Sequence, residues 1–315
     1  MPATEPGSDI LPRLVVPAPR AVLELSMADG AVVRLRRHGN PEGPRLALSH
    51  GNGLATDAYL PFWSLLAPRY DLVLFDMRNH GQNPPHGAAG HDWPHFARDI
   101  GAIRAGIARA FGAKPTTGVF HSLSAIAAAD ALVEHGTAWD ALVLFDPPFA
   151  PRRGHPAEAA HAAYMAGMAA RARRRPERYR DPRVFAFQLL GGREFGRWVP
   201  GAHVLFAEST LRPDEAAGDW VLACPRELEA RVFETNLDAT LWPRLEGRGA
   251  RLKLIGADPA LDGAKPTPAI VRDMAAELGL AYETVPGTTH FLQIEQPAEC
   301  VAALERFLRP LGLAR

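Results

Sequence analysis

The chain has 315 residues and a mass of 34.1 kDa. Hydrophobic residues make up 47% of it and charged residues 22%, a balance typical of folded globular proteins that excludes an intrinsically disordered chain. The 35 basic side chains equal the 35 acidic ones in number, so the chain lacks the positive field that a general nucleic-acid or anionic-membrane binder needs.

Residues 1–20 form a proline-rich N-terminal segment with no basic stretch followed by an apolar one, so we expect no signal peptide. Apolar runs stay well short of the ~20 residues that a membrane-spanning helix needs, which predicts no integral membrane segment. Cys224 and Cys300 are too few for a disulfide framework, and no cysteine or histidine spacing indicates zinc. These features predict a cytoplasmic protein without a metal.

The first expected elements are two alternating segments, 21–26 and 31–37, which flank Ala28-Asp29-Gly30 as in a β-hairpin. The following strands are continuous apolar runs, a pattern typical of parallel strands that are buried on both faces. Four such runs come before the middle of the chain and two after it: 45–50, 71–75, 117–120, 141–145, 251–255 and 281–285.

Helical patterns separate these strands. Phe96, Ile100, Ile103, Ile107 and Phe111 are spaced by three or four residues and form one apolar stripe, which Gly112 is placed to end. Further helices are expected over 125–135, 267–279 and 297–308. Alternating strands and helices predict an α/β fold with a doubly wound, mostly parallel sheet.

The alternation stops between residues 148 and 243, which we interpret as a cap insertion that is helical over 157–175. The core domain then comprises residues 21–147 and 244–315. The insertion should lie over the carboxyl edge of the sheet, where open α/β folds bind ligands. The basic run from Arg171 to Arg175 indicates either an anion site or a solvated helix face, and the pattern favours the second.

Ser122 carries the strongest chemical signal. It lies where the buried strand 117–120 should turn sharply into the helix 125–135, and a serine at such a turn projects its hydroxyl above the sheet as a nucleophile. The unpaired N–H groups of the helix N-terminus favour negative charge there. The competing interpretation is a serine that only caps the helix.

Other residues strengthen the catalytic interpretation. Asp258 and His290 each follow a separate predicted strand, so both should lie at the carboxyl edge of the sheet with Ser122. His50-Gly51-Asn52 follows the first buried strand, and its backbone N–H groups are placed to face an oxyanion. The order serine, aspartate, histidine is that of the α/β-hydrolases.

From about Leu23 to Leu313 the chain resembles the α/β-hydrolase fold superfamily, in its capped serine hydrolase or esterase form. His50-Gly51-Asn52 is similar to the family's HG oxyanion loop, residues 75–81 to its D-x-R-G-x-G loop, and residues 287–297 to its G-x-x-H-x-x-x-x-E-x-P segment. The elbow departs from G-x-S-x-G, since Phe120 and Ser124 replace the glycines. Phe120 should cost about 1–3 kcal/mol unless its neighbours make room. Ser124 is the less favoured alternative nucleophile.

The resemblance implies a cofactor-independent serine hydrolase that cleaves a small or medium carboxylic ester through an acyl-enzyme. Ser122 would attack, His290 would transfer the proton, Asp258 would orient the imidazole, and the backbone N–H groups of Asn52 and Leu123 would hold the oxyanion. The expected partner is a small ester-like molecule, not a nucleic acid. A thioesterase, a C–C bond hydrolase, or a non-catalytic binding module on a degenerate scaffold are the alternatives. Serine at the elbow argues against the related dehalogenases and epoxide hydrolases, which need a carboxylate nucleophile.

Several residues have competing interpretations. Asp146 follows another strand and is the main alternative to Asp258, and Asp262 is a weaker one. The His91/His95 pair has the spacing of two metal ligands but no evident third ligand, so helix capping or a surface position is favoured. The remaining polar residues near the predicted site are expected to be structural, tying loops together or supporting the elbow: Asp76, Arg78, His80 and His121.

Overall fold

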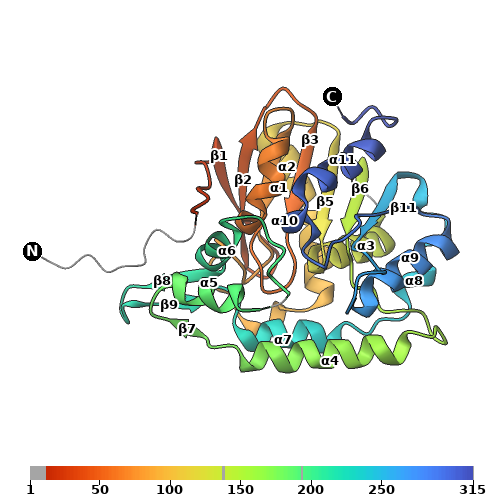
Figure 1. Ribbon diagram of the computed structural model, residues 1–315. Helices are drawn as coiled ribbons and strands as arrows, with labels where there is room; N and C mark the ends of the chain where they lie inside the picture. The colour runs from red at the N-terminus through yellow and green to blue at the C-terminus, as the bar shows by residue number, and fades with distance from the viewer. Residues whose placement is uncertain (1–11, 137–138, 193, 315) are drawn as a thin grey trace, which may run out of the picture.

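The computed structural model describes residues 12–136, 139–192 and 194–314, so residues 1–11 of the proline-rich segment lie outside the described part. Within these ranges the central sheet has eight strands in the order β1-β2-β4-β3-β5-β6-β10-β11 (Figure 1). The pairs β1/β2 and β2/β4 are antiparallel, and all the other pairs are parallel. The strands are β1 (Ala21–Ser26), β2 (Val32–Gly39), β3 (Arg45–Ser49), β4 (Asp71–Phe75), β5 (Thr116–His121), β6 (Ala141–Phe145), β10 (Leu252–Gly256) and β11 (Ala281–Thr284).

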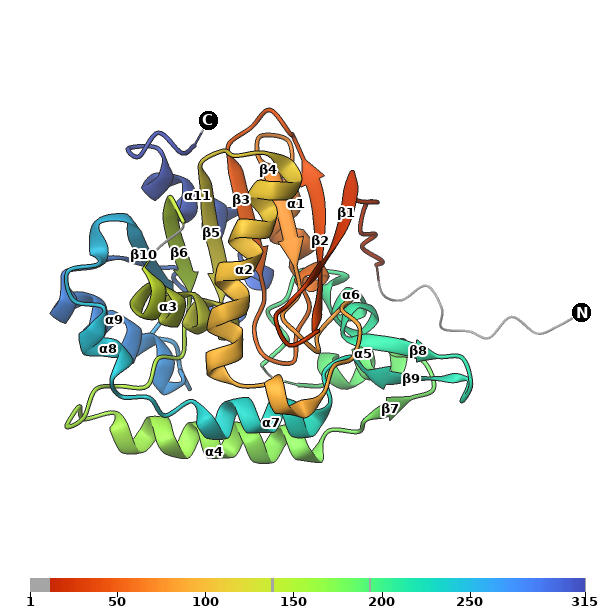
Figure 2. The same ribbon diagram turned by 180° about the vertical axis from the view of Figure 1, so that it is seen from behind.

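The sheet is covered on both faces, as its continuous apolar runs predicted. In β4, Leu72 and Leu74 belong to one hydrophobic cluster, and Val73 and Phe75 belong to the other. Because neighbouring side chains of a strand point to opposite faces, such a strand must be apolar at every position. One face is covered by α1 and α11, seen in front in Figure 1, and the other by α2 and α3, seen in front in Figure 2.

The core helices have the following bounds: α1 (Leu60–Leu66), α2 (Trp93–Phe111), α3 (Leu123–His135), α8 (Leu241–Arg244), α9 (Pro266–Leu278), α10 (Leu292–Glu295) and α11 (Pro297–Leu308). Short 3₁₀ turns lie at Thr56–Tyr59, Ala88–Gly90 and Gly249–Arg251. Helix α2 begins three residues before its predicted stripe because Asp92 caps it and accepts a hydrogen bond from the backbone N–H of His95. Helix α9 ends at Gly279, whose φ of 62° suits a glycine.

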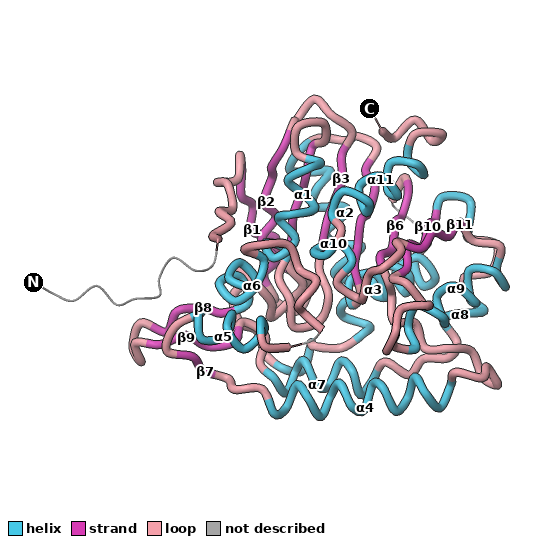
Figure 3. Tube along the Cα trace, in the orientation of Figure 1, coloured by secondary structure: helices cyan, strands magenta, loops and turns pink. Residues whose placement is uncertain are grey.

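The predicted insertion contains α4 (Glu158–Arg174), α5 (Pro182–Leu190), α6 (Ala202–Thr210) and α7 (Arg226–Thr235). Helices α4 and α7 lie side by side across the lower end of the sheet (Figures 1 and 2). The insertion also holds a small antiparallel sheet that the prediction of a helical cap did not include, coloured as strands in Figure 3: β7 (Arg178–Tyr179), β9 (Asp219–Leu222) and β8 (Leu211–Asp214). Two to four residues per strand leave too short a pattern to read from the sequence.

The described part of the proline-rich segment is attached to the rest of the fold. Leu14 and Val16 are partly buried against the hydrophobic cluster that includes α6, and Arg13 forms an ion pair with Glu208 of that helix at 3.1 Å. Across residues 12–136, 139–192 and 194–314, the helices are all too short or too polar to span a bilayer.

Candidate active site

Ser122 lies in the tight turn between β5 and α3. Its φ of 52° and ψ of −112° are unusual for a residue with a side chain, and such backbone strain is typical of a nucleophile elbow. The side chain is nearly buried, with 5% exposed. The turn leads directly into the first residues of α3, so the hydroxyl lies beside the unpaired N–H groups of the helix N-terminus.

The two departures from the usual elbow are accommodated by neighbouring residues. The ring of Phe120 packs edge-on against Phe75 and Trp139. Gly118, two residues earlier on the same face of β5, leaves the space, because a Cβ there would lie 2.4 Å from the Phe120 ring. The glycine missing at position 120 is thus compensated at position 118. Ser124 Oγ donates to the His121 carbonyl and accepts from its N–H, which makes it part of the turn rather than a nucleophile.

His290 joins Ser122 to an acid in one hydrogen-bonded chain. Ser122 Oγ lies 3.0 Å from His290 Nε2, and His290 Nδ1 lies 2.6 Å from Asp146 Oδ2. Because Nδ1–H donates to the carboxylate, Nε2 is left to accept the serine proton. The other oxygen, Oδ1 of Asp146, accepts from the backbone N–H of Ala257 at 3.1 Å, and the side chain is fully buried. Each oxygen of the Asp146 carboxylate therefore has a hydrogen-bond partner, and the two bonds fix the orientation of the side chain.

Asp258, the expected acid, makes different contacts. Its two oxygens accept the backbone N–H groups of Gly287 and Ala260, each at 2.8 Å, and these two donors lower its pKa below the usual value. Asp258 thus anchors the loop that carries His290 instead of bonding its imidazole, and the expectation for this residue is corrected in favour of Asp146. Asp262, the weaker alternative, lines a cavity near this loop and has no hydrogen bond to His290 among the described residues.

The order of the strands explains the difference. Asp146 follows β6, which lies directly beside β5 and its Ser122, whereas Asp258 follows β10, one strand farther away. The sequence contained a signal for Asp146, an aspartate directly after a buried strand, but it could not show which of the two strands is the neighbour of β5. Asp146 also has a φ of 37°, so a second tight turn aims this carboxylate.

The loop at residues 50–53 approaches Ser122 closely. A Cβ on Gly51 would lie 3.0 Å from Ser122 Cβ and 2.7 Å from a Leu54 methyl group, so only glycine permits this approach. Within the described ranges, the backbone N–H groups of Asn52 and Leu123 donate to no other protein group. The side-chain amide of Asn52 donates to the Glu229 carbonyl of α7 at 2.8 Å, which ties this loop to the cap.

A buried hydrogen-bond chain supports the site from below. The Gly51 N–H donates to the hydroxyl of Tyr59 at 3.2 Å, and this hydroxyl donates to His121 Nδ1 at 2.6 Å. His121 Nε2–H in turn donates to the backbone carbonyl of His290 at 2.8 Å. Burial lowers the pKa of His121 well below its usual value, so the ring is neutral and can accept at one nitrogen and donate at the other. The chain connects the 50–53 loop to the backbone of His290.

The remaining singled-out residues hold loops, as expected. Asp76 accepts the N–H groups of Thr56 and Gln82, and Arg78 bonds Asp99 and Asp29. His80 accepts the Gly53 N–H at 3.0 Å, which fixes the other end of the 50–53 loop.

The His91/His95 pair does not converge on a common point. His91 Nδ1 accepts from the Asn79 amide, and His95 bonds Asp92 at the start of α2. No cluster of three or more His, Cys, Asp or Glu side chains suited to a metal occurs among residues 12–136, 139–192 and 194–314. The two histidines thus make separate hydrogen bonds, to Asn79 and to Asp92.

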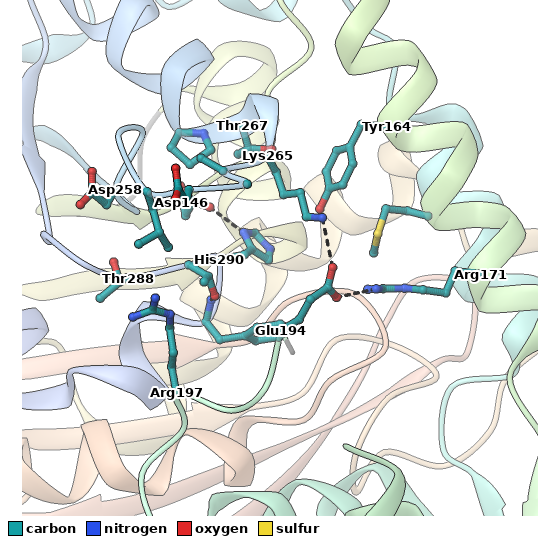
Figure 4. A pocket seen from close by; sticks show the side chains of 18 residues that line it. Asp146, Tyr164, Arg171, Glu194, Arg197, Asp258, Lys265, Thr267, Thr288 and His290 are labelled. Carbon is teal, nitrogen blue, oxygen red and sulfur yellow. Dashed lines mark hydrogen bonds and ion pairs between the residues drawn. The ribbon is translucent and has the colours of Figure 1, made fainter. Parts of the chain in front are cut away.

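Two adjoining cavities lie between the core and the cap. The smaller, about 350 Å³, is lined by Ser122 and by the 50–53 loop, α4, α5 and α7. The larger, about 530 Å³, does not reach Ser122 but includes Asp146, Asp258 and His290 (Figure 4). Tyr164 and His290 line both cavities, so the two cavities adjoin at these residues. Ser122 and His290 both line the smaller one. A ligand in the smaller cavity would contact Ser122 directly.

The mostly parallel sheet and the strained turn at Ser122 are those of an α/β-hydrolase fold. The protein belongs to the alpha/beta hydrolase family, whose model matches residues 46–303. Among curated proteins none matches this chain.

Solved structures resemble it over nearly their whole length. An E-2-(acetamidomethylene)succinate hydrolase is 19% identical with a TM-score of 0.75, covering 92% of this chain and 99% of its own. The thioesterase domain of the curacin biosynthetic pathway is 16% identical with a TM-score of 0.68, covering 90% and 100%. A thermophilic esterase from Thermogutta terrifontis is 16% identical with a TM-score of 0.66, covering 94% and 100%. At these identities the similarity shows the fold alone.

Proposed function

We propose that the protein is a serine hydrolase that cleaves a small or medium carboxylic ester through an acyl-enzyme, with Ser122, His290 and Asp146 as the triad. The observation that carries this proposal is the hydrogen-bonded chain from Ser122 Oγ through His290 to Asp146, at 3.0 and 2.6 Å. Its three members come from three separate turns at one edge of the sheet, and serine, histidine and aspartate in this order of contacts are the arrangement of a catalytic triad.

The reaction follows from these contacts. Ser122 Oγ attacks the ester carbonyl while its proton passes to His290 Nε2, and the buried carboxylate of Asp146 stabilises the imidazolium that forms. The oxyanion accepts the free N–H groups of Leu123 and Asn52, each worth roughly 3 kcal/mol in comparable sites. His290 then protonates the leaving alcohol. Water attacks the acyl-enzyme, gives its proton to Nε2, and the acid leaves as Ser122 recovers its proton.

Thioester and C–C bond hydrolysis are variants on the same residues, and ester cleavage is the default of this class. A degenerate, non-catalytic module is the alternative of a different kind. A bulky Phe120 at the elbow would favour this alternative if it distorted the turn, but Gly118 leaves space for the ring.

Reaction with a fluorophosphonate, followed by peptide mass analysis, tests the proposal. We expect labelling at Ser122 that is lost in His290→Ala, and p-nitrophenyl acetate turnover that is lost in Ser122→Ala with little change in melting temperature. Circular dichroism of each variant controls for folding. A well-folded protein that is not labelled would refute the proposal and favour the non-catalytic module. Labelling at another serine would refute the assignment of Ser122 as the nucleophile.

A further inference from the structure

Helix α4 turns one face toward the cavity above Ser122, and the character of this face changes along the helix. Tyr164, Met168, Arg171 and Arg175 all line the cavity. Their spacing of four, three and four residues places them in one stripe of a helix. The stripe begins with side chains that are largely apolar and ends, at the last turn and the C-cap, with guanidinium groups.

The guanidinium end carries more positive than negative charge. We define the cationic cluster as Arg171, Arg174 and Arg175, which line this cavity together with one carboxylate, Glu229. Three guanidinium groups against one carboxylate leave a net charge of +2 in this lining (3 − 1), and a substrate anion could supply the balance. Glu194 and Lys265 pair with each other in the lining of the larger cavity, so their charges cancel.

The existing ion pairs leave donors free. Glu194 accepts from Arg171 Nη1 and also pairs with Lys265 Nζ at 3.1 Å, so one carboxylate serves two cations (Figure 4). Arg175 donates to Glu229 through Nη1 and Nη2, at 2.7 and 3.0 Å. Arg174 has no ion pair or hydrogen bond from its side chain within the described residues. A guanidinium has five N–H donors, so each of these arginines can still bind an anion.

Arg173, in the same run, lies outside the cavity lining and pairs with Glu227 and Glu234 of α7. The side chains of Arg171 and Arg173 are 43% and 39% exposed, so the solvated helix face that the sequence favoured includes both residues. What separates them is that Arg171 also lines the cavity. The same sequence run thus supplies both a cluster to test and a matched control.

Much of the remaining lining is apolar, although it also includes the polar residues Asn52, Gln188, Glu229 and Thr267. The apolar side chains come from the 50–53 loop region, the cap and the histidine loop: Leu54, Phe185, Leu189, Phe206, Phe233 and Phe291. We propose that the substrate carries a carboxylate, separated from the scissile ester by a hydrocarbon segment, and that the cationic cluster binds this carboxylate while the ester lies at Ser122. This inference rests on the proposed hydrolase function and names its substrate class.

The chemistry suits the residues. Guanidinium groups match a carboxylate with two parallel hydrogen bonds, and a low-dielectric wall strengthens the attraction. The hydrocarbon segment would lie along Met168 and the phenylalanines, which gains apolar burial and sets the distance between the two polar ends. Part of the cluster faces solvent, so the preference for the anion should weaken as the ionic strength rises.

The test compares esters that differ only in a distal carboxylate. Mono-p-nitrophenyl esters of glutaric, adipic and suberic acid are each compared with the p-nitrophenyl ester of the monocarboxylic acid of equal length. A second pair, 4-acetoxybenzoate against phenyl acetate, places the carboxylate on the leaving group. We expect kcat/KM to favour the anionic member of at least one pair by about tenfold at low salt. In Arg171→Gln/Arg174→Gln this ratio should fall by about tenfold, and in Arg173→Gln it should persist.

Each outcome is decisive. Turnover of the neutral esters without any preference for the anionic ones would overturn this inference and leave the proposed function intact. If no ester is cleaved and Ser122 is not labelled, the proposed function fails. Binding of adipate to Ser122→Ala, followed by calorimetry, then tests the cluster alone. Binding that the double variant weakens and Arg173→Gln does not would support the anion site, and absence of binding would overturn it.

Discussion

The two walls of the cavity are held in place by different kinds of interaction. The core wall includes Ser122, His290 and Asp146, which are joined by hydrogen bonds of 3.0 and 2.6 Å. Behind it, Tyr59 bonds His121 at 2.6 Å, and His121 bonds the backbone carbonyl of His290 at 2.8 Å. The cap wall is held by arginine–carboxylate pairs whose side chains are partly open to solvent, such as Arg171 with Glu194. Buried hydrogen bonds fix geometry, whereas exposed ion pairs exchange readily with water, salt or a ligand. The core wall therefore suits chemistry, and the cap wall suits recognition.

Replacing the acid on the core wall should have the largest effect. Asp146→Asn should lower kcat for a p-nitrophenyl ester by about 10³–10⁴-fold, because the amide cannot stabilise the imidazolium or hold its tautomer. Asp258→Asn should lose less than about tenfold, since an amide oxygen can still accept one loop N–H and the imidazole keeps its partner. An equally large loss of kcat in Asp258→Asn would contradict the assignment of Asp146 and favour Asp258 as the catalytic acid.

On the cap wall, one ion pair is more buried than the others. Glu229 has a side chain only 3% exposed and pairs with Arg175, which is 24% exposed. Burial raises the pKa of Glu229, and Arg175 opposes this shift. Arg175→Gln should lower the free energy of unfolding by about 2–3 kcal/mol at pH 8 through the uncompensated buried charge. The loss should shrink at lower pH, where Glu229 takes up a proton.

Urea unfolding at pH 8 and pH 5 measures this effect, with Arg173→Gln as the exposed control. Arg173→Gln should change the midpoint little at either pH. If Arg175→Gln is as mild as Arg173→Gln, the contrast between buried and exposed pairs on the cap wall is wrong.

Low pH should destabilise the folded protein through its buried, neutral histidines. Burial lowers the pKa values of His38 and His91 to about 4 from a usual value of 6.5. Between these values the unfolded chain binds protons that the folded chain does not, so stability is present above pH 6.5 and is lost as the pH falls toward 4. Each histidine contributes a slope of up to about 1.4 kcal/mol per pH unit in that window. Denaturant midpoints at pH 7, 6 and 5 measure the slope.

His38→Gln should flatten this slope, and replacement of the exposed His135 should leave it as it is. A slope that His38→Gln does not change would mean that His38 is already protonated in the folded protein.

The smallest expected effect tests the support beneath the core wall. Tyr59→Phe removes the hydroxyl between the Gly51 N–H and His121, so the 50–53 loop and the His290 backbone lose their link. We expect kcat to fall by about tenfold with KM little changed, because positioning of the oxyanion loop matters most in the transition state. Tyr70→Phe is the control, since it removes another buried hydroxyl, bonded to Glu305 and remote from the site. Equal kcat values in the two variants would reduce Tyr59 to a packing residue.

Much of the fold was readable from local patterns. The strands at 71–75 and 141–145 and the helix at 297–308 have the bounds that their patterns predicted, because a strand or helix buried in this way must be apolar at fixed intervals. The prediction of a helical cap missed β7, β8 and β9, whose two to four residues are held by pairing with each other and not by a local pattern. The division into a core of 21–147 and 244–315 and a cap of 148–243 stays a prediction.

The candidate site was readable in its types of residue and less so in its partners. Ser122 and His290 were expected, and their Oγ and Nε2 atoms lie 3.0 Å apart, whereas the acid that bonds His290 is Asp146 and not the favoured Asp258. The anion-binding function of the Arg171–Arg175 run stays a proposal. Neither point can be decided from the sequence, for one reason. Whether Asp146 or Asp258 meets His290 depends on the order of strands in the sheet, and whether an arginine faces the cavity or solvent depends on how α4 is rotated against α7.

The amino-acid sequence by itself determined the layered fold, the strained turn at Ser122 and the placement of polar residues at strand ends, because these follow from periodicity and backbone sterics along a short stretch of chain. Tertiary structure alone decided that β6 lies beside β5, that Gly118 makes room for Phe120, and that two arginines of α4 and the arginine at its C-cap line the cavity. Each of these is a contact between segments far apart in the chain, and such contacts are set by the packing of whole elements and leave no local pattern.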